Sequence, residues 1–261
     1  MHSEASDQPG AGVSELYMLL SSTDRRRIVA ELQRSSLRLN EIAKKFDLAA
    51  TEALRQVHRL TEAGLLEKTT DGRFQATALS RLVLDTVSPM EAISKFREFF
   101  LDHDLSVLPV EFRSRLRDLI DCKLLRGTVQ VFETVTRNLT DAKKKIDASI
   151  EVGYDPILEV MRQRSEQGLR VRWLTQEGAL PTVLKSLRSA TKKPEIRVVP
   201  RLSWHVYLTD LSAAVGFRRL DGAMSYDIAF SGESPNFLRW ASDLFDRGWS
   251  EAKEWSRPTK D

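Results

Sequence analysis

One histidine in this 261-residue chain is a candidate nucleophile for phosphodiester cleavage, but the residues at the required positions after it are of the wrong type. A histidine nucleophile that cleaves phosphodiesters needs a lysine two positions on and an aspartate seven positions on. The imidazole then attacks phosphorus while the lysine holds the phosphate oxygens. His205 is the one candidate, and Tyr207 and Ser212 occupy those two positions. The sequence therefore predicts no catalytic site of this type.

Other patterns that carry chemistry are missing too. The sequence has no Gly-rich loop of P-loop spacing, no G-x-G-x-x-G dinucleotide motif and no G-x-S-x-G elbow. The single cysteine, Cys122, can form no internal disulfide, and the four scattered histidines do not complete a zinc cluster of the usual spacing. We expect no enzyme activity, no metal and no cofactor.

Basic residues at helical spacing point instead to nucleic acid. The segment TEALRQVHRLTEAGLL has one apolar stripe, which consists of Ala53, Val57, Leu60 and Leu65. Burial of that stripe turns a polar row to solvent, which consists of Thr51, Arg55, Gln56 and Arg59. Arginine and glutamine present paired donors to base edges, so this row suits the major groove of DNA.

Two helices are expected before this one. The first is capped by Thr23 or Asp24, and the second, NEIAKKF, is capped by Asn40. The second helix turns Lys44 and Lys45 outward while its apolar residues face inward. A tight turn then leads into the basic helix, so the order is that of a helix-turn-helix.

A wing is expected after the third helix. Two short strands flank a tight hairpin at Asp71-Gly72 and carry Lys68 and Arg73. Residues 23–83 contain 12 Lys plus Arg and 8 Asp plus Glu, a local charge of +4. A basic excess in one compact module is typical of a protein that neutralises phosphates there.

Bulk properties fit a two-domain globular protein. The chain has 40 Lys plus Arg and 37 Asp plus Glu, a net charge of +3, so bulk charge identifies no partner. Its hydrophobic content of 41% is ordinary for a globular protein. No stretch approaches the roughly 18 apolar residues of a membrane span, and the polar N-terminus lacks a secretory pattern. We expect a cytoplasmic protein without a membrane partner.

The chain changes class near residue 145, where short alternating runs replace helices. Ile146, Ala148 and Ile150 alternate with polar residues, and a helix opening at Asp155 leads to a second alternating run, a βαβ unit. A terminal helix from Pro235 carries a broad aromatic stripe. The remaining expected elements are a helix at about 179–189 and strands at 195–199, 204–209, 213–219 and 225–230.

Nearly the whole chain, from about residue 14, resembles a family of archaeal transcription regulators. TEALRQVHRLTEAGLLEK with its hairpin and FQATALSRLVLD resembles the ArsR-type winged helix. PMEAISKFREFFLDHDLSVLP and FLRWASDLFDRGWSEAKEW are similar to the family typified by the methanogenesis and filamentation regulator of methanogens. The resemblance implies DNA reading by the third helix and the wing. It also implies a C-terminal sensor whose fold is like phospholipase D, as in TrmB-like regulators.

A sensor pocket is expected beyond the carboxyl ends of the strands, as in open α/β sheets. The candidate residues follow the runs that end near 152, 174 and 199, and they are Tyr154, Gln176, Glu177, Arg201, Trp204, His205 and Tyr207. For each of these side chains the alternative is a core or rim position. His103 is expected to fix a turn between two helices.

The expected layout is an arm over 1–12, a winged helix-turn-helix over 13–88, a helical connector over 89–144 and an α/β sensor sandwich over 145–261. Connector helices are expected at about 89–101, 110–121 and 128–144. The first carries an apolar stripe of Ile93, Phe96, Phe99 and Phe100, which forms either intramolecular core or a homodimer seam.

We expect a homodimer that binds double-stranded promoter DNA and responds to a small-molecule effector. Two alternatives remain: a phosphodiesterase or nuclease of the phospholipase D fold targeted by the winged helix, and a protein-interaction module of a transcription complex. The run from Arg25 to Arg27 is expected to be a solvated helix face rather than a DNA reader.

Overall fold

The computed structural model describes residues 11–188, 192 and 194–255. The chain divides into two compact units, Met1–Met90 and Glu91–Asp261, and the division falls within helix α5 (Ala78–Lys95). Most of the expected arm over 1–12 lies outside the described residues. Its last two residues belong to helix α1 (Ala11–Leu20), so the helical structure begins earlier than expected.

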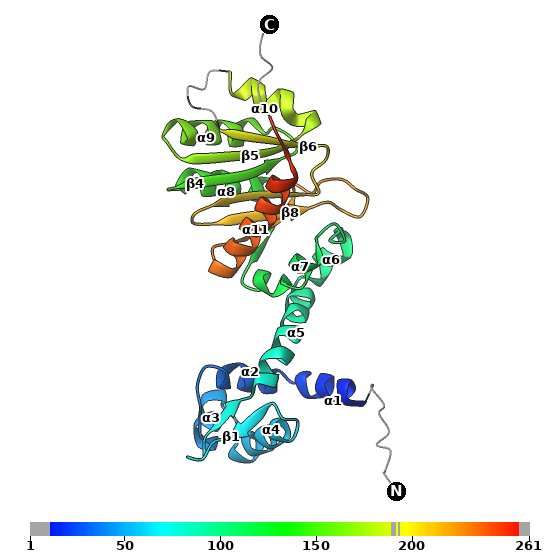
Figure 1. The fold of residues 1–261 in the computed structure, drawn as a ribbon, viewed down its shortest axis with the longest axis vertical. Helices are drawn as coiled ribbons and strands as arrows, with labels where there is room; N and C mark the ends of the chain where they lie inside the picture. Colours follow the sequence, from blue (N-terminus) through cyan, green and yellow to red (C-terminus); the bar gives the residue numbers. More distant parts are fainter. Residues whose placement is uncertain (1–10, 189–191, 193, 256–261) are drawn as a thin grey trace. The chain divides into compact units, whose positions relative to one another are not determined.

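In the first unit, α1 is followed by three further helices and a two-stranded hairpin, and these three helices with the hairpin have the order expected of a winged helix (Figure 1). Ile28, Ile42 and Leu60, one from each helix, are completely buried in its core. Gly72 adopts the left-handed conformation that the hairpin turn requires, with φ +79°. The elements are α2 (Thr23–Leu32), α3 (Leu39–Phe46), α4 (Ala50–Glu62), β1 (Leu66–Lys68) and β2 (Phe74–Ala76).

Both expected caps in this unit were wrong by one or two residues. Ser22 caps α2, and its hydroxyl accepts a hydrogen bond from the backbone N–H of Arg25. Arg38 precedes α3, and its backbone N–H donates to the Glu41 carboxylate at 2.7 Å. This hydrogen bond caps the first turn of α3. The helix therefore begins at Leu39, and Asn40 lies inside it.

The second unit is built on one eight-stranded mixed sheet, which confirms the expected mixed α and β class. The expected βαβ unit is present, because β4 (Lys145–Ile150) and β5 (Arg170–Gln176) are parallel and α9 (Asp155–Glu166) joins them. The strand order is β10 (Lys253–Glu254), β6 (Glu195–Val199), β5 (Arg170–Gln176), β4 (Lys145–Ile150), β7 (Trp204–Thr209), β8 (Ala213–Phe217), β9 (Ile228–Gly232) and β3 (Lys123–Arg126).

Two separate hydrophobic clusters cover the two faces of this sheet. One contains Trp240 and Phe230, together with residues of the helices α11 (Pro235–Glu251), α6 (Arg97–Asp102), α7 (Val110–Arg113) and η1 (Leu116–Leu119). The other contains Trp173 and residues of α8 (Thr128–Asp141), α9 and α10 (Leu180–Ser186). Alternation along β7, β8 and β9 sends successive side chains into opposite clusters, so the sheet is a middle layer (Figure 1).

The separate helical connector expected over 89–144 is not present as such. Phe96 and Phe99 are buried against Phe230, with ring centroids 4.9 and 4.7 Å apart. The apolar stripe is therefore mostly intramolecular core, and only Ile93 is exposed. Residues 123–126 form the edge strand β3 rather than part of a connector, because they pair antiparallel with β9.

The polar side of β4 is also buried, contrary to the usual pattern for an alternating strand. Asp147 has no exposed side-chain surface, and its carboxylate receives Arg172 Nε at 2.6 Å and Lys145 Nζ at 3.0 Å. These hydrogen bonds and charges lower the pKa of Asp147 against the effect of burial, which alone would raise it. The alternation thus separates two buried faces rather than core from solvent.

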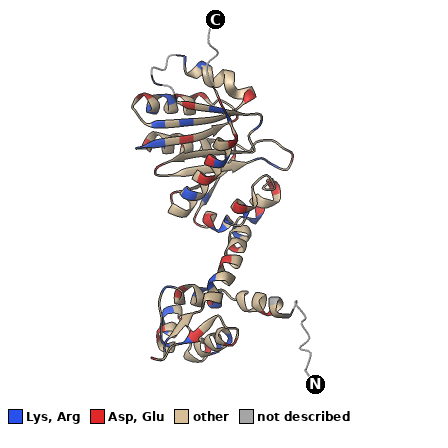
Figure 2. Cartoon of the chain, in the orientation of Figure 1, with Lys and Arg blue, Asp and Glu red and all other residues tan. Residues whose placement is uncertain are grey.

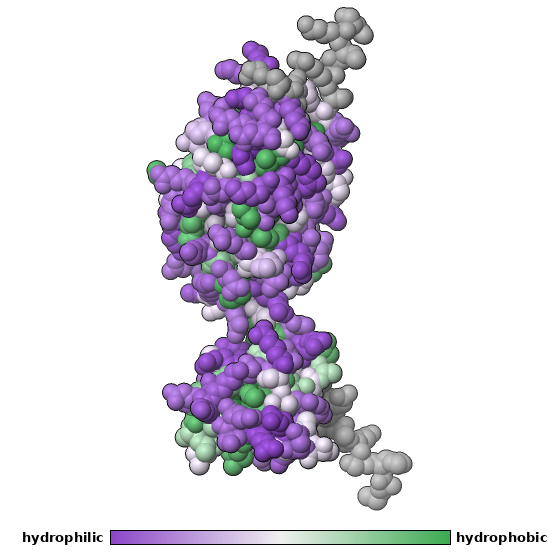
Figure 3. Space-filling model, turned by 90° about the vertical axis from the view of Figure 1, so that its left-hand side faces the viewer, coloured by the Kyte–Doolittle hydropathy of each residue, from purple (hydrophilic) through white to green (hydrophobic). Residues whose placement is uncertain are grey.

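Charge is spread over both units. Lys and Arg are interspersed with Asp and Glu (Figure 2), and the face of the second unit in Figure 3 is mostly hydrophilic with scattered hydrophobic spots. Across residues 11–188, 192 and 194–255, every helix is too short or too polar to span a bilayer.

Truncation of Trp240 tests the layer that α11 builds. Trp240 is completely buried, and its Nε1 donates to the Phe112 carbonyl oxygen at 3.3 Å. We expect Trp240→Ala to lower the unfolding free energy by about 3–5 kcal/mol, the usual cost of removing a large buried aromatic side chain. Arg239→Ala, at the exposed neighbouring position, is the matched control and should change stability little. Denaturant unfolding of both variants checks this, and equal midpoints would contradict it.

Candidate functional site

The exposed side of α4 is the strongest candidate for contact with a ligand of high negative charge. Ala53, Val57 and Leu60 are buried, as the apolar stripe predicts. Arg55 and Arg59 are one turn apart on the exposed side, and Thr51 is exposed at the start of the helix. Residues four apart on a helix lie side by side, so the two guanidinium groups present one basic surface.

The fourth residue expected in this row, Gln56, is not available to DNA. Its side chain is only 5% exposed, because Gln56 lies next to Val57 on the buried edge of α4. Gln56 Oε1 accepts a hydrogen bond from Arg25 Nη1 at 2.9 Å, and its Nε2 donates to Glu52. Assignment of Gln56 to the exposed row was therefore wrong.

Arg25 was also misplaced by the sequence pattern. It is buried, and its guanidinium donates to the carbonyl oxygens of Leu19 and Met18 at the end of α1. Arg26 donates to the next carbonyl, that of Leu20, at 2.5 Å. The last carbonyls of a helix have no partner within the helix, so both arginines cap α1 rather than form a solvated charge run.

The lysines of α3 and of the wing are exposed. Lys44 and Lys68 have exposed side chains, and Lys68 Nζ lies 5.9 Å from the centroid of the Phe74 ring. Lys45 is also exposed but forms an ion pair with Glu31 at 2.7 Å. The side-chain hydrogen bond from Lys45 is the largest cause of the lowered pKa of Glu31.

Arg73 has a structural task within the wing. Its Nη1 donates to the Ser36 carbonyl oxygen at 3.0 Å and lies 3.2 Å from a Glu41 carboxylate oxygen. Its Nε pairs with Asp71 at 3.2 Å. Arg73 thus holds the hairpin against α3. Although it was expected to contact DNA, its guanidinium already has three partners within the chain.

The expected sensor residues differ in exposure and in the groups that they contact. Gln176 Oε1 accepts a hydrogen bond from the Leu202 backbone N–H at 3.4 Å, and Arg201 Nη2 donates to the Gly222 carbonyl oxygen at 3.1 Å. Glu177 is exposed at the start of the short helix η2 (Glu177–Ala179). Tyr207 is buried in the sheet core, so it belongs to the packing rather than to a pocket.

His205 is a buried residue of β7 and is paired with Gly216 of β8. Its ring stacks on Tyr226 with centroids 5.8 Å apart and an interplanar angle of 18°. Its Nε2 would lie 2.0 Å from a Cβ at Gly216, so only glycine fits on the neighbouring strand. Its Nδ1 is buried and has no hydrogen-bond partner among the described residues, and the same is true of Nε1 of Trp204.

Three polar residues near His205 were missed by the sequence analysis. Glu151 follows β4 directly and forms an ion pair with Arg218 at 2.5 Å. Tyr226 Oη donates to the other Glu151 oxygen at 3.0 Å. The sequence analysis looked for site residues directly after each strand. It placed the end of this strand near residue 152, whereas β4 ends at Ile150, and so it passed over Glu151.

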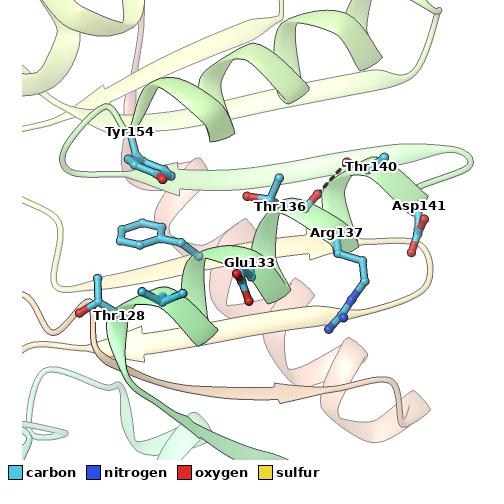
Figure 4. A pocket seen from close by; sticks show the side chains of 9 residues that line it. Thr128, Glu133, Thr136, Arg137, Thr140, Asp141 and Tyr154 are labelled. Atoms are coloured by element: carbon cyan, nitrogen blue, oxygen red, sulfur yellow. Dashed lines mark hydrogen bonds between the residues drawn. The ribbon is translucent and has the colours of Figure 1, made fainter.

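Tyr154 lies at a different place, over an open groove of about 640 Å³ beside α8. Its ring packs on Phe132 with centroids 4.4 Å apart. Figure 4 shows Tyr154 facing the α8 side chains that form the rest of the groove, among them Glu133 and Arg137. The groove therefore combines two aromatic rings with charges of both signs.

The two positions where a phosphodiester-cleaving site would have lysine and aspartate hold other groups. Tyr207 is a buried phenol, and burial raises its pKa. Ser212 lies in the turn between β7 and β8, where its backbone oxygen accepts from the Thr209 hydroxyl at 3.1 Å. Among the described residues, no three His, Cys, Asp or Glu side chains are grouped to hold a metal ion.

Comparison with known proteins identifies no family for this chain. No family model matches the sequence, and no curated protein matches it either. Similar solved structures include TrmBL2, an archaeal chromatin protein, with 13% identity, a TM-score of 0.41 and coverage of 93% of this chain and 99% of that one.

Two further similar structures cover about half of this chain. Nuc from Salmonella typhimurium, a phospholipase D family member, is 10% identical with a TM-score of 0.41, over 52% of this chain and 100% of its own. NucT from Helicobacter pylori is 8% identical with a TM-score of 0.42, over 52% of this chain and 99% of its own. Likenesses at this level decide neither the fold nor the function.

The burial of His205 predicts a loss of stability in acid. Burial lowers the pKa of His205 to about 4, and the nearby His103 shifts it in the same direction. In the unfolded chain the imidazole titrates near 6.5, so the unfolded state binds this proton first as the pH falls. The contribution of neutral His205 to the free energy of unfolding is fully present above about pH 6.5, and it is lost as the pH falls from there to about 4.

We expect the unfolding free energy of the wild type to fall by about 2 kcal/mol more between pH 7 and pH 4.5 than that of His205→Gln, which cannot take up the proton. Denaturant titrations of both proteins at the two pH values measure this difference. Equal losses in the two proteins would show that His205 is protonated as readily in the folded chain as in the unfolded one.

Proposed function

We propose that this protein is a transcription regulator that binds double-stranded DNA through α4 and the hairpin of the first unit. The observation that carries the proposal is the pair of exposed arginines, Arg55 and Arg59, on the side of α4 opposite its buried stripe. Exposed Lys44 and Lys68 extend the basic surface to α3 and to the hairpin. The segment 23–83 carries the +4 charge excess that such a surface needs.

The proposed mechanism divides the contacts by their chemistry. A helix the size of α4 fits the major groove, where an arginine can donate two hydrogen bonds to a guanine edge. The lysines of α3 and the hairpin contact phosphates, which fix the register of the protein without reading sequence. In a cell without a nucleus, such binding places the protein in the cytoplasm.

A homodimer is part of this proposal, with α1 as the contact helix. Tyr17 and Met18 are 54% and 68% exposed, which is unusual for large apolar side chains on one short helix. Their burial against the same helix of a second copy would remove that surface from water. Two winged helices then match the two half-sites of a palindromic operator.

For the second unit we propose a non-catalytic sensor domain with a fold like phospholipase D. The non-catalytic part of this proposal is supported by Tyr207 and Ser212, which stand where phosphodiester cleavage by His205 would need lysine and aspartate. A small-molecule effector would bias two arrangements of the dimer by binding one of them more tightly.

Two other functions make different predictions. A phosphodiesterase would hydrolyse a phosphodiester and lose that activity on substitution of His205. The feature of the described residues that favours such chemistry is the buried Nδ1 of His205, which has no hydrogen-bond partner among them. A protein-interaction module would have negligible affinity for DNA even at low salt.

Substitution of Arg59 tests the proposed function. Occupancy of the genome by the tagged protein first identifies the best site, and binding to a duplex of that sequence is then titrated. We expect Arg59→Ala to weaken binding about tenfold or more, because one charged contact to DNA is lost. Arg239→Ala, the same change on the exposed side of the second unit, is the control and should bind like the wild type. Equal affinities of all three proteins would contradict the assignment of α4.

A further inference from the structure

A continuous chain of polar contacts runs from α1 to the exposed face of α4. It begins at the buried guanidinium of Arg25, whose Nη1 donates to Gln56 Oε1 at 2.9 Å. Gln56 Nε2 in turn donates to Glu52 Oε1. The other oxygen of Glu52 pairs with Arg55 Nη2 at 2.6 Å. Gln56 and Glu52 thus connect the buried Arg25 to the exposed Arg55.

The chemistry of these groups determines which atom donates and which accepts at each contact. A guanidinium has donors alone, so it takes the carbonyl end of the Gln56 amide and leaves the amino end for another acceptor. That amino end meets the carboxylate of Glu52, one helical turn earlier on α4. Glu52 is therefore held from behind by a buried amide while it holds Arg55 in front.

The charges support the same arrangement. Hydrogen bonds from Arg55 and then Gln56 lower the pKa of Glu52, so its carboxylate stays ionised. Arg59 has no ion-pair partner among the described residues. The two exposed arginines of α4 therefore differ, because one is held by a carboxylate and the other is not.

We propose that Glu52 is a specificity-determining residue that directs Arg55 to a base edge rather than to a phosphate. This inference rests on the proposed binding of DNA by α4. The ion pair with Glu52 uses one of the two Nη2 hydrogens of Arg55. The second Nη2 hydrogen, together with Nη1–H or Nε–H, still forms a planar pair of donors for the two acceptors of a guanine edge. A phosphate at the same place would bring a second negative charge next to the Glu52 carboxylate, and that repulsion disfavours non-specific contact.

The test compares two glutamates of the same helix. Glu52→Gln removes the negative charge that holds Arg55, whereas Glu62→Gln removes an exposed glutamate that pairs with His58 at 3.1 Å. Affinity is measured for the best genomic site and for an unrelated duplex of equal length. We expect Glu52→Gln to bind the unrelated duplex more tightly and to lower the ratio of the two affinities about tenfold. Glu62→Gln should raise both affinities alike and leave the ratio unchanged.

Equal ratios for Glu52→Gln, Glu62→Gln and the wild type would overturn this inference while the proposed function stands. No measurable binding of either duplex by the wild type would instead overturn the proposed function itself.

A second variant keeps the inference testable if Glu52→Gln does not fold. Arg55→Lys retains the positive charge but lacks the planar pair of donors. We expect this variant to lose the affinity ratio while the salt dependence of its binding stays that of the wild type. An unchanged ratio would mean that Arg55 contacts phosphate, and the inference would be wrong.

Discussion

The burial of one stripe of α4 constrains everything that the first unit presents to solvent. Val57 and Leu60 are almost completely buried with residues of α2 and α3, which fixes the rotation of the helix about its axis. Because a helix turns by about 100° per residue, Arg55 and Arg59 then face outward together while Gln56 turns toward the core. The exposed arginines and the buried polar chain behind them are two consequences of the same packing.

In the second unit the corresponding constraint is a sheet with two apolar faces. Both faces must be covered, and the segment after α5 provides part of one cover, with Phe99 against Phe230. The loop after α6 is also tied to the end of β8, because the Asp104 N–H donates to the Arg218 carbonyl oxygen at 2.9 Å while the Arg218 side chain pairs with Glu151. A change at Glu151 therefore has a direct structural route to α6.

Regular patterns predicted most elements, and tertiary contacts account for the errors. The alternation at Ile146, Ala148 and Ile150 and the aromatic stripe after Pro235 predicted a strand and a helix that the structure contains. The edge strand β3 was missed because four residues carry too little periodicity, and its pairing with β9 is not a local property. Arg25 and Gln56 were misplaced for a related reason, since a polar side chain is buried only when a distant partner satisfies it. The sensor residues were predicted by position after strands, and this rule passed over Arg218 because residues 213–219 were expected to form one strand, whereas β8 ends at Phe217.

The central claim is that α4 reads bases while the lysines of α3 and the hairpin neutralise phosphates, and the salt dependence of DNA binding tests it most directly. Affinity for the best genomic duplex should be measured from 50 to 300 mM salt, and its logarithm plotted against the logarithm of the salt concentration. Release of counterions by a dimer predicts a straight line with a slope of about −4 or steeper. Weak binding with a slope near zero would contradict the claim and favour a surface that contacts protein.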